Sequence, residues 1–236
     1  FIFKLKANFT VRIQGFMGQV MTQGGPLLLF SCMALTMLVL SRKRTRFLWG
    51  LGLLLSLFAL ILAQTRNAWI GLVISSCLIL FLFKPLAVII VPVAVGIVYF
   101  ASPQSIKDRA LSSFNPKHSL NLPRIEYIRA GIKIVRDYPL FGTGPDTVEI
   151  VFQNLKYGLS EEAKKNVHLH NNIIQTAAER GIPTLLAWLT FLVWTFLSLF
   201  KLLKNKDPSL KPFTAAALAA VVGLNVAGLF EYNFAD

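Results

Sequence analysis

Long apolar runs separated by short polar turns dominate the chain. Each run is close to the roughly 20 residues that an α-helix needs to cross a bilayer. The runs lie near residues 24–40, 47–64, 67–83, 85–101, 182–200 and 213–230. Because backbone groups in lipid have no water partner, each run is expected to be a helix. The pattern therefore predicts an all-α polytopic membrane protein with about six transmembrane helices.

The polar segments divide the chain into three parts. Residues 1–101 hold a mixed lead-in and the first four apolar runs, and residues 172–236 hold the last two. Residues 102–171 form the one long extramembrane segment between them. The chain opens at Phe1 and stops at Asp236 just after an apolar run, which indicates part of a larger membrane protein.

The net charge of +13 would suit a nucleic-acid partner, but the distribution of charge argues against one. Basic side chains gather in three of the turns: Arg42, Lys43, Arg44 and Arg46; Lys84; and Lys201, Lys204, Lys206 and Lys211. These turns all fall on one side if the six runs alternate, which is the pattern of cytoplasmic loops. Residues 102–171 should then lie outside, in the periplasm of a Gram-negative cell. The expected surroundings are membrane lipids, with no nucleic acid.

Within the external segment, residues 122–137 show helical periodicity. At 100° per residue Ile125, Ile128, Ile132 and Val135 share one face, and charged side chains share the other. A helix of this kind can lie flat against the membrane surface. It can equally pack on the rest of the external segment, and the periodicity does not choose between these interpretations.

Several arginines stand where the charge pattern does not call for them. Arg66 opens the third run from the outer side, where it either snorkels to head groups or serves a function. Arg124 falls on the apolar face of the predicted helix and needs an anion, and a guanidinium fits a phosphate bidentately. Arg12 is external with a weaker signal, whereas Arg129 and Arg136 fall on the solvated face.

The stretch VHLHNNIIQTAAERGIPTLLAW, residues 167–188, stands at the start of the fifth run. Asn171 or Asn172 is a suitable N-cap, and Gly181 breaks the helix that follows. His170 then precedes a helix N-terminus, whose positive end disfavours imidazolium. A neutral imidazole can accept a proton from an alcohol. A histidine present only for its interfacial position is the alternative.

His168 lies two residues before His170 and should point elsewhere. Two histidines at this spacing make a poor zinc pair without further ligands, and the sequence shows no such ligand cluster. No metal site is predicted.

Four pieces of the chain resemble one superfamily in the same order. His170-Asn171, nine residues, Gly181, two residues and Thr184 fit the pattern H-[NSQ]-x9-G-x-x-[GTY] of O-antigen ligases. QTRNAWIG, LPRIEYIRAGIKIVRDYPLFGTGP and GLFEYNFAD resemble other segments of the same proteins. The chain is thus similar to the O-antigen ligase and O-antigen polymerase superfamily, closest to the ligases. It is shorter than that pattern and lacks the usual Trp after Arg124.

This resemblance implies a GT-C-like membrane glycosyltransferase. No metal or cofactor is expected, because the sequence shows no metal-ligand cluster and the arginines would replace the usual Mg²⁺. The implied donor is a glycan on undecaprenyl diphosphate, the implied acceptor is lipid A core, and transfer inverts the anomeric centre. The reaction would take place at the periplasmic face of the bacterial inner membrane. His170, Arg66 and Arg124 are the expected catalytic residues. The candidate substrate-binding residues are Arg12, Asn171, Arg129 and Arg136.

Other functions stay open on the sequence. An O-antigen polymerase or a protein O-oligosaccharyltransferase would use the same donor with a different acceptor. A transporter of lipid-linked glycan would bind the donor without chemistry, since intramembrane charges and broken helices also occur in transporters.

Overall fold

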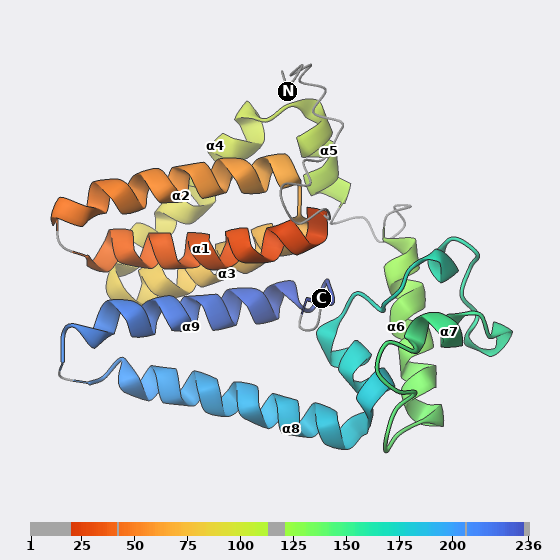
Figure 1. Ribbon diagram of the computed structural model, residues 1–236. Coiled ribbons are helices and arrows are strands. Elements are labelled where there is room, and N and C mark those ends of the chain that lie inside the picture. Colours follow the sequence, from red (N-terminus) through yellow and green to blue (C-terminus); the bar gives the residue numbers. More distant parts are fainter. Residues whose placement is uncertain (1–19, 42, 113–120, 206, 234–236) are drawn as a thin grey trace, which may run out of the picture.

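The computed structural model describes residues 20–41, 43–112, 121–205 and 207–233. Within these residues the regular structure is entirely helical. Helices α1 (Val20–Leu40), α2 (Lys43–Ala63), α3 (Arg66–Phe83) and α9 (Leu210–Ala227) form a bundle, and α8 (Asn172–Leu202) lies along α9 (Figure 1). A smaller part at one end of the bundle contains α6 (Leu122–Asp137) and α7 (Val148–Phe152).

Five of the six predicted membrane runs are confirmed as helices long and apolar enough to cross a bilayer, namely α1, α2, α3, α8 and α9. The sixth run differs. It begins as the 3-10 helix η2 (Pro85–Ile89) and continues as α4 (Ile90–Ala101), and together these are shorter than the others. Pro85 at the start of η2 lacks an N–H, which suits the first turn of a helix. The short helix α5 (Gln104–Ser112) follows.

Small residues let the helices of the bundle approach closely. A Cβ on Gly71 of α3 would lie 2.4 Å from the carbonyl oxygen of Gly223 on α9, so these two backbones are in direct contact. Short polar side chains add contacts between helices, with Ser31 Oγ donating to Ser56 Oγ at 2.9 Å. Close backbone approach and small polar pairs are the usual means of packing helices in lipid, where apolar burial alone gives no advantage.

The basic turns lie at one end of the bundle. The α1–α2 turn and the α8–α9 turn are both at the left of Figure 1, and α6 and α7 are at the opposite end. Lys84, at the end of α3, lies at the same end of the bundle as these turns, because α3 runs antiparallel to α2. This arrangement agrees with the grouping of basic turns on one side of the membrane.

The smaller part that contains α6 and α7, termed the external part, has a hydrophobic core of its own. Tyr127, Ala130 and Ile134 of α6 are buried against Val148 and Phe152 of α7. The short 3-10 helices η3 (Leu155–Tyr157) and η4 (Ala163–Lys165) complete the cluster, together with Ala178 from the first turns of α8.

The bounds predicted for α6 are confirmed, and α6 packs on the rest of the segment through a face other than the predicted apolar one. Ile128 and Ile132 are exposed, at 43% and 44%, while the buried positions are Tyr127, Ala130 and Ile134. The large ring of Tyr127 and the small Ala130 fit against α7 and α8 better than four branched side chains would. Thus α6 packs on the external part and still leaves an apolar isoleucine strip uncovered.

A kink divides α8 into an external and a membrane half. Gly181 has φ 81° and ψ 168°, and Pro183 follows it, so the predicted break is confirmed. Residues 139–144 fill the gap: Ile182 N donates to Pro139 O, and Thr143 N and Gly144 N donate to Ala178 O and Glu179 O. Every polar backbone group freed near a membrane needs such a partner, and this loop supplies it.

Candidate active site

His170 lies in the turn that leads into α8. Its backbone has φ 50°, in the left-handed region that side-chain-bearing residues seldom adopt. Neighbouring contacts hold this conformation. Leu169 N donates to Gln175 Oε1 at 2.7 Å, and the Asn171 side chain accepts from Ile174 N at 3.0 Å as the N-cap of α8. Strained backbone of this kind is commonly found where a side chain must be aimed at a ligand.

Glu231 pairs with His170. Its Oε1 lies 2.6 Å from His170 Nδ1, and the glutamate is only 2% exposed. Glu231 comes from the segment after α9, which is tied to the start of α8 by Asn172 N donating to Gly228 O and Asn171 Nδ2 donating to Leu229 O. With the carboxylate accepting from Nδ1–H, the imidazole is held in the tautomer that presents Nε2 as an acceptor.

The protonation of Glu231 follows from its surroundings. Burial raises the pKa of this carboxyl. The hydrogen bond from His170 and the electrostatic attraction of His170, His168 and Arg124 more than offset burial, so the pKa of Glu231 lies below the ordinary value. Glu231 is therefore an anion at neutral pH.

His168 is closer to His170 than the sequence predicted. The two rings are in edge contact with centroids 4.3 Å apart, and His168 Nε2 lies 3.6 Å from Glu231 Oε1. The prediction that His168 points elsewhere is therefore wrong. Residues two apart face different sides of a helix, but the segment before α8 is not helical, since His170 has a positive φ, and both rings reach one carboxylate.

Tyr127 forms a wall of the site. Its ring centroid is 5.4 Å from that of His170, and its hydroxyl donates to Ala163 O while accepting from Asn166 Nδ2. Burial raises the pKa of Tyr127 to about 12. The phenol stays neutral and anchors α6 to the segment that carries His170.

Arg66 begins α3 at the same end of the bundle. It is 8% exposed, and its Nη1 donates to Ser112 Oγ of α5 at 3.1 Å. Arg124 and Arg109 are its charged neighbours. Arg109 Nε itself donates to Gln64 O, in the turn before α3. Three guanidinium groups thus gather where α3, α5 and α6 meet, and such a cluster favours an anion.

Arg124 links this cluster to the histidine. Burial lowers the pKa of Arg124, and the nearby Glu231 carboxylate opposes that effect. Arg124 is thus an electrostatic neighbour of both Arg66 and Glu231, and Glu231 bonds His170. The three side chains expected to be catalytic are thus linked through neighbouring charges, Arg66 to Arg124 and Arg124 to the partner of His170.

The other expected site residues do not join this group in the same way. Arg129 and Arg136 are exposed on the side of α6 away from its buried face. The amide of Asn171 is occupied within the protein, as the cap of α8 and as a donor to Leu229 O. Arg12 lies outside the described residues.

Sequence reasoning missed Glu231, Tyr127, His168 and Arg109 as parts of the site. The segment GLFEYNFAD had drawn notice only as a piece of a larger resemblance. An acidic residue directly after the last apolar run, on the same membrane side as His170, was the one signal that could have identified Glu231.

His168, His170 and Glu231 also form a set of possible metal ligands. One donor atom from each residue lies within 4.8 Å of the others. The statement that no further ligand accompanies the two histidines is therefore wrong, since Glu231 supplies one from 61 residues away. The surroundings of these three residues nevertheless argue against a bound cation. The His170–Glu231 contact has the length of a hydrogen bond, and the nearby charge of Arg124 opposes a second cation.

An apolar helical bundle with a half-buried imidazole paired to a buried carboxylate, beside arginines, suits a membrane protein that handles an anionic substrate. The O-antigen ligase (Wzy_C) family matches residues 51–189, more than half of the chain, and the chain belongs to that family. The matched region includes Arg66, Arg124 and His170. Proteins of this family are typically bacterial membrane glycosyltransferases that use lipid-linked glycans. A search of curated proteins gives no match.

Proposed function

We propose that this protein is an O-antigen ligase that moves a glycan from undecaprenyl diphosphate to lipid A core. Transfer takes place at the periplasmic face of the inner membrane and inverts the anomeric centre. The observation that supports this proposal best is the buried His170–Glu231 pair, with Nδ1 and Oε1 2.6 Å apart, beside the cluster that contains Arg124 and Arg66.

His170 serves as the base. The acceptor hydroxyl has a pKa far above 7 and must lose its proton as its oxygen bonds to the anomeric carbon. His170 Nε2 takes that proton while Nδ1–H stays bonded to Glu231, whose negative charge stabilises the imidazolium. A positioned base of this kind contributes roughly 10²–10⁴ in rate.

Arg66 and Arg124 serve the leaving group. The bond between the anomeric carbon and the diphosphate oxygen breaks, and the diphosphate leaves with the electron pair. Guanidinium groups aimed at this oxygen stabilise the developing charge and do not need to reorganise, because Arg66 is already held by Ser112. The two arginines occupy the role that a magnesium ion takes in many enzymes acting on diphosphates.

The experiment is glycan transfer by the purified protein in vesicles. A defined oligosaccharide on undecaprenyl diphosphate is offered with lipid A core, a second lipid-linked glycan and a pilin-like protein. Labelled lipid A core is the expected product. Labelling of the second glycan or the pilin instead would assign a polymerase or a protein oligosaccharyltransferase. Glycan movement across the bilayer without bond cleavage would assign a transporter.

Variants test the assigned roles. His170→Ala should lower kcat by about 10²–10⁴, and Arg66→Ala should lower it by about 10²–10³. Arg66→Lys keeps the charge but loses the bidentate fork, so it should recover only part of the activity. Lys165→Ala, at an exposed lysine of η4, is the matched control and should transfer normally. Normal turnover by a folded His170→Ala protein would remove the base assignment.

We also propose that transfer needs no resident metal. The His170–Glu231 hydrogen bond uses the donor atoms that an ion would need, and the arginines supply the positive charge. Dialysis against EDTA should leave the rate unchanged, and added Zn²⁺ should not raise it. Loss of activity on chelation, restored by one divalent ion, would instead assign the His168, His170 and Glu231 set as a metal centre.

A further inference from the structure

A buried glutamate in α8 takes no part in the chemistry proposed above. Glu179 is 1% exposed and lies in the external half of α8, nine residues after His170. Gln175, one turn earlier and also 1% exposed, donates from Nε2 to Glu179 Oε1 at 2.8 Å. Residues four apart on a helix face each other, so α8 itself brings this pair together. The other carboxyl oxygen, Glu179 Oε2, has no hydrogen-bond partner among the residues that the structure describes.

Burial of this carboxyl is unfavourable by itself. Burial raises the pKa of Glu179 above its ordinary value of 4.5, the hydrogen bond from Gln175 and the charge of Arg180 oppose this effect, and Asp146 adds to it. A carboxyl that is withdrawn from water with one oxygen bonded stabilises a core less well than an apolar side chain of the same size. The stability of the external part therefore does not account for a carboxyl at this position, whereas its contact with Gln175 does.

Gln175 connects Glu179 to the turn that carries His170. Its Oε1 accepts from Leu169 N at 2.7 Å, and Leu169 directly precedes His170. The amide of a glutamine has one acceptor end and one donor end. Because Glu179 accepts from the donor end, the acceptor end faces Leu169. The reverse orientation would place the amide nitrogen against a second N–H group and the amide oxygen against a carboxyl oxygen. Glu179 thus fixes the orientation of the amide that Leu169 requires.

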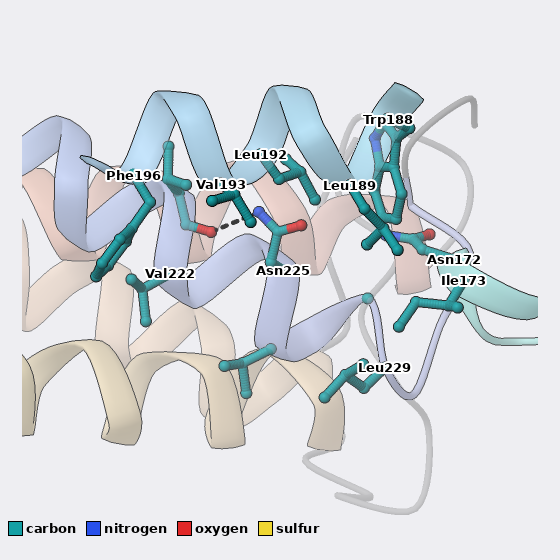
Figure 2. A pocket seen from close by; sticks show the side chains of 13 residues that line it. Asn172, Ile173, Trp188, Leu189, Leu192, Val193, Phe196, Val222, Asn225 and Leu229 are labelled. Carbon is teal, nitrogen blue, oxygen red and sulfur yellow. Dashed lines mark hydrogen bonds between the residues drawn. The ribbon is translucent and has the colours of Figure 1, made fainter. Parts of the chain in front are cut away.

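The turn is held on both sides of His170. On the far side, Asn172 Nδ2 donates to Asn233 Oδ1 at 2.8 Å, and Asn233 N donates to Asn172 Oδ1 at 3.0 Å. Asn172 lies at one end of an apolar groove between α8 and α9 (Figure 2). On the near side, the Gln175 side chain holds Leu169. The left-handed conformation of His170, with φ 50°, therefore lies between two fixed residues, and this conformation brings its Nδ1 to the buried carboxylate.

We propose that Gln175 and Glu179 are positioning residues for the base, because they hold the backbone at Leu169 in the conformation that keeps the His170 imidazole on Glu231. Both side chains are too deeply buried to touch the substrate. They act on the fraction of molecules in which Nδ1–H of His170 is bonded to Glu231 and Nε2 faces the acceptor hydroxyl. This assignment rests on the proposed function, in which His170 is the base.

Two substitutions of Glu179 separate its hydrogen bond from its charge and its volume. Glu179→Gln keeps an oxygen that can accept from Gln175, so kcat for glycan transfer in vesicles should stay within about five-fold of the wild type. Glu179→Met has a similar volume but no such acceptor, and it should lower kcat about 10–100-fold, the effect of a misplaced catalytic group. The KM for the lipid-linked donor should change less than about two-fold in both variants, because Arg66 and Arg124 are untouched.

Ile134→Ala is the matched control. It removes a fully buried side chain from the core of the same external part. The variant should therefore lower the thermal unfolding midpoint in detergent without lowering kcat. An equal loss of kcat in Ile134→Ala and Glu179→Met would overturn the proposal, because any weakening of the external part would then have the same effect.

A nuclear magnetic resonance spectrum of the imidazole tests the positioning role without substrate. Histidine labelled with ¹⁵N in the ring reports which ring nitrogen carries the proton, and the signal of His170 is assigned by its loss in His170→Ala. At mildly alkaline pH the wild type, Glu179→Gln and Ile134→Ala should all show the Nδ1–H tautomer of His170. Glu179→Met should show part of the population as the Nε2–H tautomer, because the ring is no longer held on Glu231.

Exchange of the two residues keeps the proposal testable if Glu179→Met does not fold. In Gln175→Glu two carboxyls lie side by side and share a proton at low pH, so kcat should fall relative to the wild type as both ionise with rising pH. In the double variant Gln175→Glu, Glu179→Gln the pair is reversed, and the new carboxylate accepts from Leu169 N and from the new amide. Its pH profile should follow that of the wild type. The charged neighbours Asp146 and Arg180 are the same in both proteins. Identical profiles for the single and the double variant would overturn the proposal.

The spectrum and the transfer assay together separate this proposal from the proposed function. Glycan transfer in which Glu179→Met changes neither kcat nor the tautomer of His170 overturns the positioning role alone. The expected change of tautomer, without any glycan transfer by the wild type, supports the positioning role and overturns the ligase assignment alone.

Discussion

Glu231 is a buried carboxylate that faces two imidazoles and a guanidinium. It contacts His170 and His168, and Arg124 is an electrostatic neighbour. Removing the carboxylate would leave Arg124 without this neighbouring opposite charge and His170 Nδ1–H without its acceptor. The carboxylate thus has two effects, since it orients the imidazole and it makes the cationic cluster tolerable in a buried place.

The substitution Glu231→Gln should change how the stability of the fold depends on pH. The pKa of Glu231 is lowered from 4.5, so its ionised form stabilises the fold above about pH 4.5, and this contribution is lost as pH falls through the lowered pKa. At neutral pH the variant should be less stable by about 1.5–3 kcal/mol, the range for a hydrogen bond to a charged group. The measurement is the thermal unfolding midpoint in detergent between pH 7 and 3. Because the variant has no carboxyl to protonate, its midpoint should fall less than that of the wild type. Parallel curves would contradict this account.

The two kinds of site residue differ in how far a sequence can reveal them. Arg66, Arg124 and His170 each violate a local rule, of charge placement or of helix patterning, and so stand out by themselves. Glu231 violates none. Its role depends on a contact across 61 residues, which forms only when α9 returns to the start of α8. His168 was misjudged because the local backbone turn at His170 is a property of the folded chain.

Among the helices, α8 shows how one element serves both parts of the molecule. Its first turns pack in the external core through Ala178, and α8 is long and apolar enough to cross a membrane. Gly181 divides the two halves, and a Cβ there would lie 2.0 Å from Leu140 O. Gly142 is held equally tightly, with a would-be Cβ 2.2 Å from the Glu179 carbonyl carbon. The loop and the kink therefore fit only with glycine at both places.

Gly181→Ala should loosen this junction. With φ 81° and ψ 168° the position belongs to a region open essentially to glycine, so alanine should cost at least about 1–3 kcal/mol. Gly96→Ala in α4 is the matched control, because a Cβ there meets nothing within 4 Å, and it should be neutral or slightly stabilising. Thermal unfolding of both variants in detergent measures the difference. Equal stability of the two would show that the kink tolerates a side chain.

The sequence predicted elements better than faces. The bounds of α6 and the break in α8 followed from Pro123, Gly181 and Pro183, which act locally on the backbone. The buried face of α6 did not follow, because two apolar faces compete on that helix and the choice depends on the shape of α7 and α8. The uncovered strip with Ile128 and Ile132 belongs to the apolar face for which the periodicity left two partners open, the membrane surface or the rest of the segment.

At the scale of the whole molecule the two ends of the bundle differ in kind. Arg66, Arg124 and His170 stand at one end with the external part, and the basic turns between α1 and α2 and between α8 and α9 stand at the other. The run pattern predicted this polarity, since alternating spans place those turns together. It did not predict that the first two turns of α8 would join the external core, because that packing depends on where α6 and α7 fold against them.

This polarity predicts how the protein sits in the membrane. In a protein with Cys32 and Cys77 replaced by alanine, single cysteines are placed at Gln153, in the external part, and at Lys204, in the α8–α9 turn. Both positions are exposed, so a difference in labelling reports membrane side. A membrane-impermeant maleimide added to intact spheroplasts should label position 153 and spare position 204. After the cells are permeabilised, both should be labelled. The reverse pattern would put Arg66 and His170 on the cytoplasmic side. It would therefore contradict the proposal that glycan transfer to lipid A core takes place at the periplasmic face.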